Sequence, residues 1–231
     1  MIARHQLIRL NAAGWARAAG QAASAEASLC LRHWADQGLP VVVTRQACQA
    51  VPGDGGVSVG IAAPLQWGRV RVPLLVRQSD IAYFDGFPEA KLACRLMPRE
   101  DRSAWQALFQ ALSSAGLRCR VYGSFGWQLL TDLAYLHPGS DVDLLVFVGG
   151  PEEADVAAGL LGQHGRLGLA PRVDGELVFG NGSAVSWREW LSWRAGTTAS
   201  ILVKSAHGVA LADSLVFTQR RWVESPELSV A

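Results

Sequence analysis

The chain has almost no net charge and very few lysines. Its 231 residues carry a formal charge of +1, and the only lysines among many arginines are Lys91 and Lys204. Proteins that grip long stretches of nucleic acid normally carry a clear excess of positive charge. A nucleic-acid substrate is therefore disfavoured, and the preference for arginine over lysine indicates nothing by itself.

Metal-binding cysteine patterns and long apolar runs are also missing. The cysteines form no CxxC pair, so we expect reduced and mostly buried thiols in place of a zinc site or a disulfide framework. No stretch approaches the roughly 20 apolar residues needed to cross a bilayer, and the first 20 residues lack the apolar core of a signal peptide. We expect a cytoplasmic protein without a membrane partner. The cysteines are Cys30, Cys48, Cys94 and Cys119.

Half of the residues are apolar, which is enough for a substantial core. The first part of the chain mixes one amphipathic helix, predicted over 22–37, with short β-branched runs. It is predicted to form a small α+β domain over residues 1–85. The weakly patterned segment 79–97 is the predicted connection to the next domain. The predicted strands are 40–45, 57–61 and 70–76, separated by turn-forming residues at 52–56 and 64–68.

The second part, 95–231, is predicted to be a larger α+β domain with a mixed sheet flanked by helices. Its helices follow from apolar residues at helical spacing, and its strands from short apolar, partly β-branched runs. The order of elements is strand, glycine turn, helix, strand. We expect helices over 103–112, 125–136, 151–163 and from 187 to 193, strands over 117–122, 141–148 and 172–179, and a short buried run over 201–205.

Two acidic residues stand at the start of the most apolar predicted strand, DVDLLVFV. Side chains alternate between the faces of a strand, so Asp141 and Asp143 project to the same side. Two carboxylates that share a small volume repel each other unless a cation neutralises them, and hard oxygen ligands select Mg²⁺ or Mn²⁺. A lone DxD pattern is also compatible with solvated turn residues at the start of a strand.

The Gly123-Ser124 turn upstream favours the metal hypothesis. It lies between a predicted strand and a predicted helix, where backbone N–H groups and the Ser124 hydroxyl can face an anion. Glycine lets a phosphate approach the backbone closely. The alternative for Ser124 is that it only caps the helix.

A later strand offers a third carboxylate. Asp174 and Glu176 alternate with apolar residues and so share one face. We choose Asp174 as the third metal ligand, because its side chain is shorter and it precedes Gly175. Asp141, Asp143 and Asp174 are thus the predicted catalytic and metal-binding residues.

This ordered set resembles the nucleotidyltransferase superfamily of DNA polymerase beta type. Within it, the chain is similar to the malonate decarboxylase holo-acyl-carrier-protein synthases, also called phosphoribosyl-dephospho-CoA transferases. The matching segments span almost the whole chain. They are RHQLIRL near the start, Trp34 with the following GLPVVVTR, GSFGWQ from Gly123, SDVDLL from Ser140, DGEL from Asp174 and WREW from Trp187.

The resemblance implies an enzyme that takes triphosphoribosyl-dephospho-CoA, attaches its phosphoribosyl-dephospho-CoA portion to a serine of the apo acyl carrier protein of malonate decarboxylase, and releases pyrophosphate. The carboxylates then hold two divalent ions, and Gly123 and Ser124 steady the outer phosphates. Asp174 is also the candidate acceptor of the serine proton. The first domain is expected to recognise the carrier or the CoA portion. Acidic carriers fit its arginines, such as Arg4, Arg9, Arg17, Arg32 and Arg45.

Several residues keep two interpretations. Lys204 and Arg45 are candidate phosphate contacts, with a solvated lysine and a surface salt bridge as the alternatives. The tryptophans 187, 190 and 193 recur at helical spacing, which favours core packing over a base-stacking platform. Two other functions also stay open. One is a nucleotidyl transfer to a small-molecule hydroxyl, and the other is a carrier- or CoA-binding module without chemistry.

Overall fold

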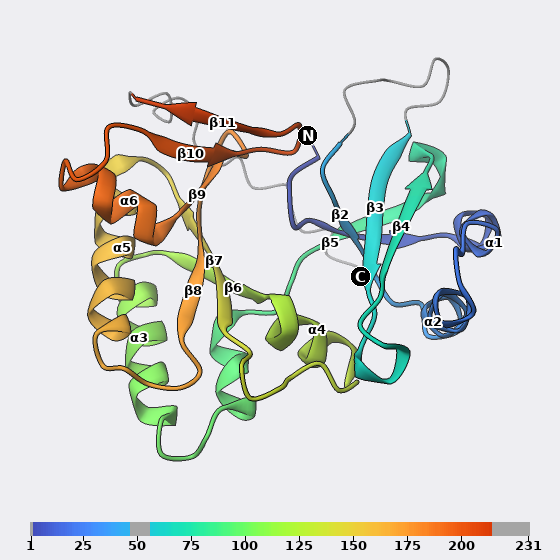
Figure 1. The fold of residues 1–231 in the computed structure, drawn as a ribbon, viewed down its shortest axis with the longest axis horizontal. Coiled ribbons are helices and arrows are strands. Elements are labelled where there is room, and N and C mark those ends of the chain that lie inside the picture. Colours follow the sequence, from blue (N-terminus) through green and yellow to red (C-terminus); the bar gives the residue numbers. More distant parts are fainter. Residues whose placement is uncertain (1, 47–55, 214–231) are drawn as a thin grey trace, which may run out of the picture.

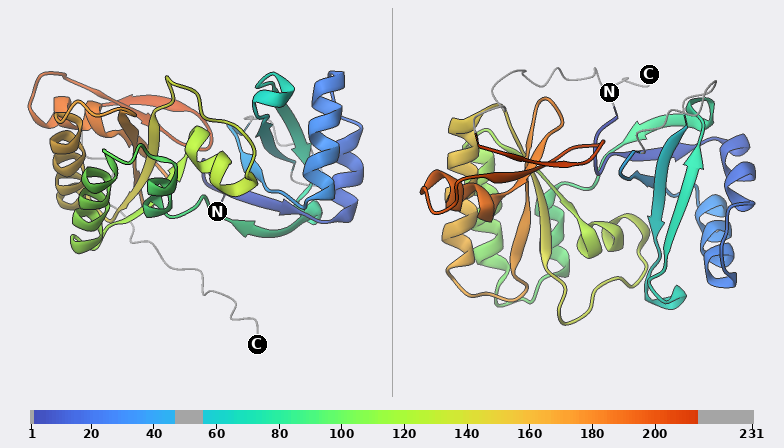
Figure 2. Two further views of the ribbon diagram at one scale, coloured as in Figure 1. Left: turned by 90° about the horizontal axis from the view of Figure 1, so that it is seen from below. Right: turned by 45° about the horizontal axis from the view of Figure 1, so that its top comes forward.

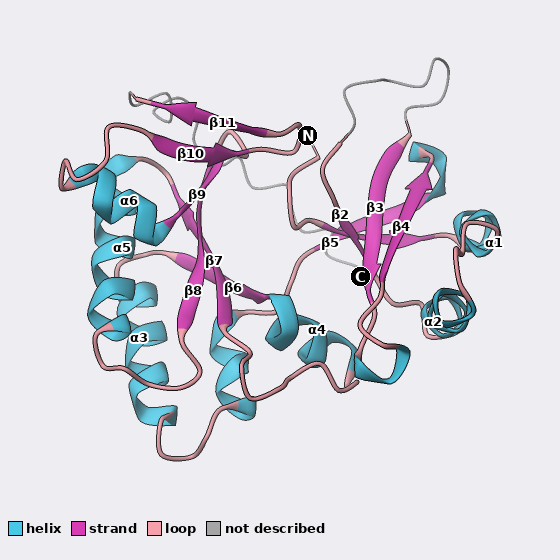
Figure 3. Ribbon diagram, in the orientation of Figure 1, coloured by secondary structure: helices cyan, strands magenta, loops and turns pink. Residues whose placement is uncertain are grey.

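The structure is a computed structural model, and it describes residues 2–46 and 56–213. The described chain builds two β-sheets with helices packed against them, so the predicted α+β fold class is confirmed (Figures 1 and 3). The first sheet has five strands in the order β4-β3-β2-β1-β5. The second has six in the order β11-β10-β9-β8-β7-β6.

Antiparallel strands make up the first sheet. The predicted helix and three predicted strands of this region are confirmed, while β1, α1 and β5 were not predicted. In α1 the N-terminal Asn11 side chain accepts a hydrogen bond from Gly14 N–H at 2.9 Å, and the absence of a side chain at Gly14 lets Asp80 approach. The elements are β1 (Leu7–Leu10), α1 (Ala12–Ala19), α2 (Ala25–Asp36), β2 (Val41–Val43), β3 (Val57–Ala62), β4 (Arg71–Val76) and β5 (Ile81–Asp85), with short 3-10 turns at Leu65–Trp67 and Gln78–Asp80.

The second sheet is mixed, because β7 and β8 are parallel while the other neighbours are antiparallel. The predicted strands and helices of this half appear near their expected places, and β9 and β11 are additional. The elements are the 3-10 helix η3 (Ala90–Leu96), α3 (Arg102–Ser114), β6 (Arg118–Tyr122), α4 (Gly123–Thr131), β7 (Val142–Val148), α5 (Pro151–Gly165), β8 (Val173–Phe179), β9 (Ala184–Ser186), α6 (Trp187–Arg194), β10 (Ile201–Lys204) and β11 (Val209–Ala212).

One face of the second sheet is covered by α3 and α5 (Figures 1 and 2). Alternate residues of β7 point into this core, where Val142, Leu144, Val146 and Val148 are fully buried. The residues between them, including Asp143, therefore lie on the opposite face. The acidic residues share their face of the sheet with Leu145, which belongs to a smaller apolar cluster.

Helix α4 lies between the two sheets and contributes to both cores, with Phe125 in the core of the second sheet and Trp127 in that of the first (Figure 1). The Trp127 ring packs against Phe87 at 5.4 Å and Trp34 at 6.3 Å between ring centroids, and stacks with Tyr135 at 6.2 Å. The hydroxyl of Tyr135 donates to the carbonyl of Ala62 at 2.7 Å. Side chains of the second half therefore pack into the core of the first sheet, and the domain boundaries 1–85 and 95–231 stay a prediction.

The helix predicted over 125–136 is wrong in both bounds, since α4 begins at Gly123 and ends at Thr131. Asp132 adopts a left-handed conformation with φ 56°, which stops the helix. The Gln128 side-chain oxygen then accepts hydrogen bonds from the backbone N–H of Tyr135 and Leu136, at 3.0 and 3.1 Å. These contacts hold 132–136 as a loop that the apolar pattern alone does not reveal.

Burial decides between the two interpretations of the three tryptophans. Trp187 and Trp190 are buried and Trp193 packs against the same core, so the core interpretation of these tryptophans is confirmed.

Cys30, Cys94 and Cys119 are free thiols, and Cys48 lies outside the described residues. The predicted turn at 52–56 lies outside them as well, apart from Gly56. Among the helices of the described ranges, none has the length and apolarity to cross a membrane.

Candidate active site

Two of the three predicted carboxylates lie side by side on neighbouring strands. In the parallel pairing of β7 and β8, Asp143 is directly opposite Asp174. Directly opposite residues point to the same face of a sheet, so the two side chains share one side. Asp141 immediately precedes β7, and its charge is close enough to raise the pKa of Asp143. Chain positions 31 residues apart thus form one acidic group.

Gly123 lets the Asp143 carboxylate lie against the start of α4. Its φ is +60°, a left-handed conformation that favours glycine, and a Cβ here would overlap Oδ2 of Asp143. Tyr122 occupies the N-cap position without a side-chain hydrogen bond, and Ser124 lies in the first turn. Ser124 is therefore not the helix cap, and in the described part of the chain the N-cap residue leaves the first-turn N–H groups without a side-chain cap.

The electrostatics of Asp143 differ from those of an ordinary surface acid. Burial, together with the nearby carboxylates of Asp174, Asp141 and Glu176, raises the pKa of Asp143 to about 7. Within the described residues no cation forms an ion pair with it. Among the acids of this group, Asp143 is thus the one without a counter-ion in the described part of the chain, a condition that favours binding of a cation beside it.

The two outer acids have arginine partners. Nε and Nη2 of Arg172 donate to the two carboxylate oxygens of Asp141, at 3.1 and 2.6 Å, and Arg188 approaches Asp174 at 4.0 Å. In the part of the chain that the structure describes, no three His, Cys, Asp or Glu side chains are placed together to hold a metal ion. Asp143 and Asp174 fit a divalent ion by ligand chemistry and charge, whereas Asp141 fits as a third ligand only after it leaves Arg172.

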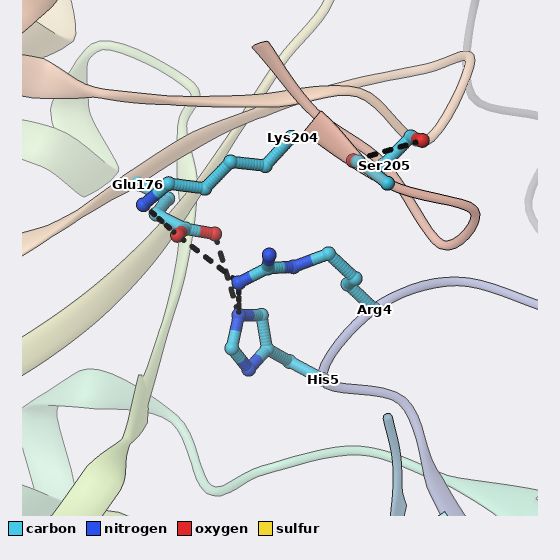
Figure 4. A network of polar contacts seen from close by, with 6 residues as sticks. Arg4, His5, Glu176, Lys204 and Ser205 are labelled. Carbon is cyan, nitrogen blue, oxygen red and sulfur yellow. Dashed lines mark hydrogen bonds and ion pairs between the residues drawn. The ribbon is translucent and has the colours of Figure 1, made fainter. Parts of the chain in front are cut away.

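Glu176 is the other acidic side chain on this face, and it is buried among cations (Figure 4). Lys204 donates to its Oε1 at 2.8 Å and Arg4 to the same oxygen at 3.3 Å. His5 Nε2 lies 3.3 Å from Oε2. Burial alone would raise the pKa of Glu176, but His5, Lys204 and Arg4 lower it to about 2. Lys204 thus lies next to the acidic group and is not an isolated solvated lysine.

Tyr122 lies between the acidic pair and the cations around Glu176. It is the residue opposite Asp143 in the antiparallel pairing of β6 and β7, and its ring lies 4.4 Å from the ring of His5. Burial and the carboxylates of Glu176, Asp143 and Asp174 raise its phenol pKa. Sequence reasoning did not find Arg4, His5 or Tyr122 as site residues, because no local spacing relates positions 4 and 5 to 176.

Arg45 lies elsewhere. It is exposed just beyond β2, and its guanidinium lies beside Gly208 in the turn between β10 and β11. The neighbouring Gln46 N–H donates to the carbonyl of Ala206 at 2.7 Å. Arg45 therefore marks a contact between the two sheets, and its role as an anion contact stays a prediction.

Comparison with known proteins accounts for nearly all of the chain. Residues 3–86 match the family model described as the phosphoribosyl-dephospho-CoA transferase MdcG N-terminal domain, and residues 90–214 match the model of its C-terminal domain. No solved structure gives a significant match.

Curated relatives carry the name phosphoribosyl-dephospho-CoA transferase. A protein of Xanthomonas campestris pv. campestris (strain 8004) is 36% identical over 215 residues, covering 91% of this chain and 94% of the relative. One of Bradyrhizobium diazoefficiens is 32% identical over 220 residues, covering 91% and 89%. One of Pseudomonas putida is 36% identical over 176 residues, covering 75% and 78%. The chain is therefore a transferase that belongs to the phosphoribosyl-dephospho-CoA transferase family.

Proposed function

We propose that this transferase moves the phosphoribosyl-dephospho-CoA group from 2'-(5''-triphosphoribosyl)-3'-dephospho-CoA to a serine of the apo acyl carrier protein of malonate decarboxylase, releasing pyrophosphate. The observation that carries the proposal is the juxtaposition of Asp143, Asp174 and Gly123. Paired carboxylates beside an uncapped helix N-terminus suit a reaction at a phosphate chain. Family membership supplies the phosphoribosyl-dephospho-CoA group.

The proposed reaction is one substitution at phosphorus. The serine oxygen forms a bond to the α-phosphorus, the bond from that phosphorus to the bridging oxygen of the β-phosphate breaks, and pyrophosphate leaves. Asp174 takes the serine proton. The first-turn N–H groups of α4 and the hydroxyl of Ser124 hold the outer phosphates, and the bare backbone of Gly123 permits their approach.

Divalent ions complete the proposal. Mg²⁺ or Mn²⁺, held by Asp143 and Asp174 with Asp141 as a third ligand, would neutralise developing charge on the phosphates. Arg172 pairs with Asp141 at 2.6 Å. In this proposal Arg172 neutralises the Asp141 carboxylate until that carboxylate binds a divalent ion. The order strand, glycine turn, helix, strand, with carboxylates on β7 and β8, also supports the proposed place in the DNA polymerase beta-like nucleotidyltransferase superfamily.

Fewer of the predicted arginines are available for carrier recognition by the first domain than the sequence indicates. Arg4 contacts Glu176, Arg9 pairs with Asp85 at 3.2 Å, and Arg17 donates to the buried Asp80 at 3.0 Å. Partners inside the chain already use these three side chains. Arg32 and Arg45 are exposed and remain the candidates for an acidic carrier surface.

The test measures the mass of an apo acyl carrier protein after incubation with the enzyme, Mg²⁺ and the triphosphoribosyl donor. We expect the carrier to gain the mass of one phosphoribosyl-dephospho-CoA group, and an equal amount of pyrophosphate to appear. Excess chelator should stop both. An unchanged carrier together with modification of a small-molecule hydroxyl would favour a different acceptor, and binding without any pyrophosphate release would favour a non-catalytic module.

A further inference from the structure

The first residues of the chain reach across to the second sheet. Arg4 and His5 precede β1, yet their side chains contact Glu176 on β8 (Figure 4). His5 has a φ of +60°, a left-handed conformation that is uncommon for a residue with a side chain. Contacts with Tyr122 and Glu176 hold it in this conformation. Strained backbone of this kind is concentrated at functional sites.

The ion-pair cluster around Glu176 contains more cations than carboxylates. One carboxylate faces two permanent cations, Lys204 at 2.8 Å and Arg4 at 3.3 Å, in addition to the imidazole of His5. Nε of Arg4 is buried and has no hydrogen-bond partner among the described residues. A partly buried surplus charge and an unused donor are unfavourable until an anion approaches them.

The position of these cations beside the acidic pair indicates which ligand they bind. Glu176 follows Asp174 by two residues on the same face of β8, a distance of about 6.6 Å along the strand. The cations therefore lie one short step from the acidic pair, comparable with the length of a linear phosphate chain. Arginine and lysine together are the side chains that bind phosphate most readily.

We propose that Arg4 and Lys204, held beside the acidic group by Glu176, bind the terminal phosphates of the triphosphate donor, so that the N-terminal segment completes the active site. This inference rests on the proposed function. It adds Arg4 as a substrate-binding residue and gives Lys204 a defined ligand. The first domain then contributes to donor binding directly, beyond any role in carrier recognition.

The test uses inorganic tripolyphosphate as the probe and isothermal titration calorimetry of the full chain with Mg²⁺. Arg4→Gln and Lys204→Gln should each weaken tripolyphosphate binding at least tenfold. Arg4→Lys keeps the charge and should recover part of the affinity. Arg9→Gln is the matched control, since the side chains of Arg4 and Arg9 are both 26% exposed and each contacts one carboxylate, at 3.3 and 3.2 Å. It should leave the affinity unchanged.

A second probe separates a binding role from general damage. Dephospho-CoA lacks the triphosphate, so Arg4→Gln should leave its affinity unchanged, whereas a disturbed fold would weaken both probes. Wild-type affinity for tripolyphosphate in Arg4→Gln and Lys204→Gln, or equal loss for both probes, would overturn the inference. The two proposals can fail separately. If the carrier is not modified but Arg4→Gln still weakens tripolyphosphate binding, the proposed function is contradicted and the phosphate site is supported.

Discussion

Asp143 is placed where its ionised form is unfavourable in the absence of a cation. It is largely buried, it lies opposite Asp174, and its carboxylate lies against the backbone of Gly123. A folded-state pKa of about 7, above the ordinary value of 3.8, means that the folded protein binds this proton more tightly than the unfolded chain. The associated stability is complete below pH 3.8 and is lost as the pH rises through about 7.

Asp143→Asn should therefore abolish transfer and stabilise the metal-free protein. At pH 8 we expect a gain on the order of 3 kcal/mol in the free energy of unfolding, because the variant has no charge to desolvate. The gain should vanish near pH 3. Mg²⁺ should reduce the difference in stability between variant and wild type, because it binds and stabilises the wild type. Urea denaturation at pH 3 and pH 8, with and without chelator, measures this. Equal stability of variant and wild type at pH 8 in chelator would contradict it.

Gly123 offers a second prediction at this scale. Gly123→Ala places a Cβ on the Asp143 carboxylate, so we expect transfer to fall at least a hundredfold. Gly116→Ala is the control, since Gly116 also has a left-handed φ, of +75°, but open space around it. The control should lose only about 1 kcal/mol of stability and keep its activity. Steady-state kinetics with circular dichroism separates the two effects, and a Gly123→Ala enzyme as active as the control would refute the close approach.

At the scale of elements, α4 is the helix through which the two halves of the molecule meet. Its first residue is beside Asp143, and its middle is packed in the core of the first sheet through Trp127. The position of the glycine turn therefore depends on packing contributed by the first domain. A helix anchored in this way keeps its N-terminal N–H groups fixed relative to the carboxylates of β7 and β8.

Trp127→Ala should consequently lower activity by more than its loss of stability explains. Removing a buried tryptophan costs roughly 3–5 kcal/mol, and the shift of α4 should reduce kcat/KM of the remaining folded protein at least tenfold. Leu112→Ala on α3 removes a fully buried side chain from the core of the second sheet and serves as the comparison. It should reduce stability with little effect on the folded enzyme. Similar specific activities for the two folded variants would count against the coupling.

At the scale of the whole molecule, a few polar contacts join the two sheets. Glu176 on β8 holds Arg4 and His5 of the first domain, Gln46 N–H donates to the carbonyl of Ala206, and Arg120 donates to the carbonyl of Phe87. The pKa of Glu176 is lowered to about 2, so its contribution to stability is present above pH 4.5 and is lost as the pH falls from about 4.5 to 2.

Glu176→Gln should lower the free energy of unfolding on the order of 3 kcal/mol at pH 7 and flatten the acid limb of the stability curve between pH 4.5 and 2. Glu89→Gln is the control, because both side chains of the Glu89–Lys91 pair are largely exposed and such a pair contributes little. Denaturation at pH 7, 4.5 and 3 tests this. An unchanged slope of stability with pH across the acid limb in Glu176→Gln would show that the cluster does not hold the two sheets together.

The sequence by itself determined the acidic face and the glycine turn. The alternation of DVDLLVFV places Asp143 opposite a buried face, and the same rule applied to the later strand places Asp174 and Glu176 together. These features follow from the local geometry of an extended chain. The order of strand, glycine turn and helix around Gly123 could be predicted because it too follows from local sequence pattern.

Only the tertiary structure decided which charged groups meet there. Arg4 contacts Glu176 across 172 positions, Asp141 is paired with Arg172, and α4 ends early because Asp132 turns left-handed and Gln128 binds the following loop. None of these follows from a repeat of two or 3.6 residues. They depend on how the two sheets pack around α4, and that packing is fixed by burial of side chains from both halves at once.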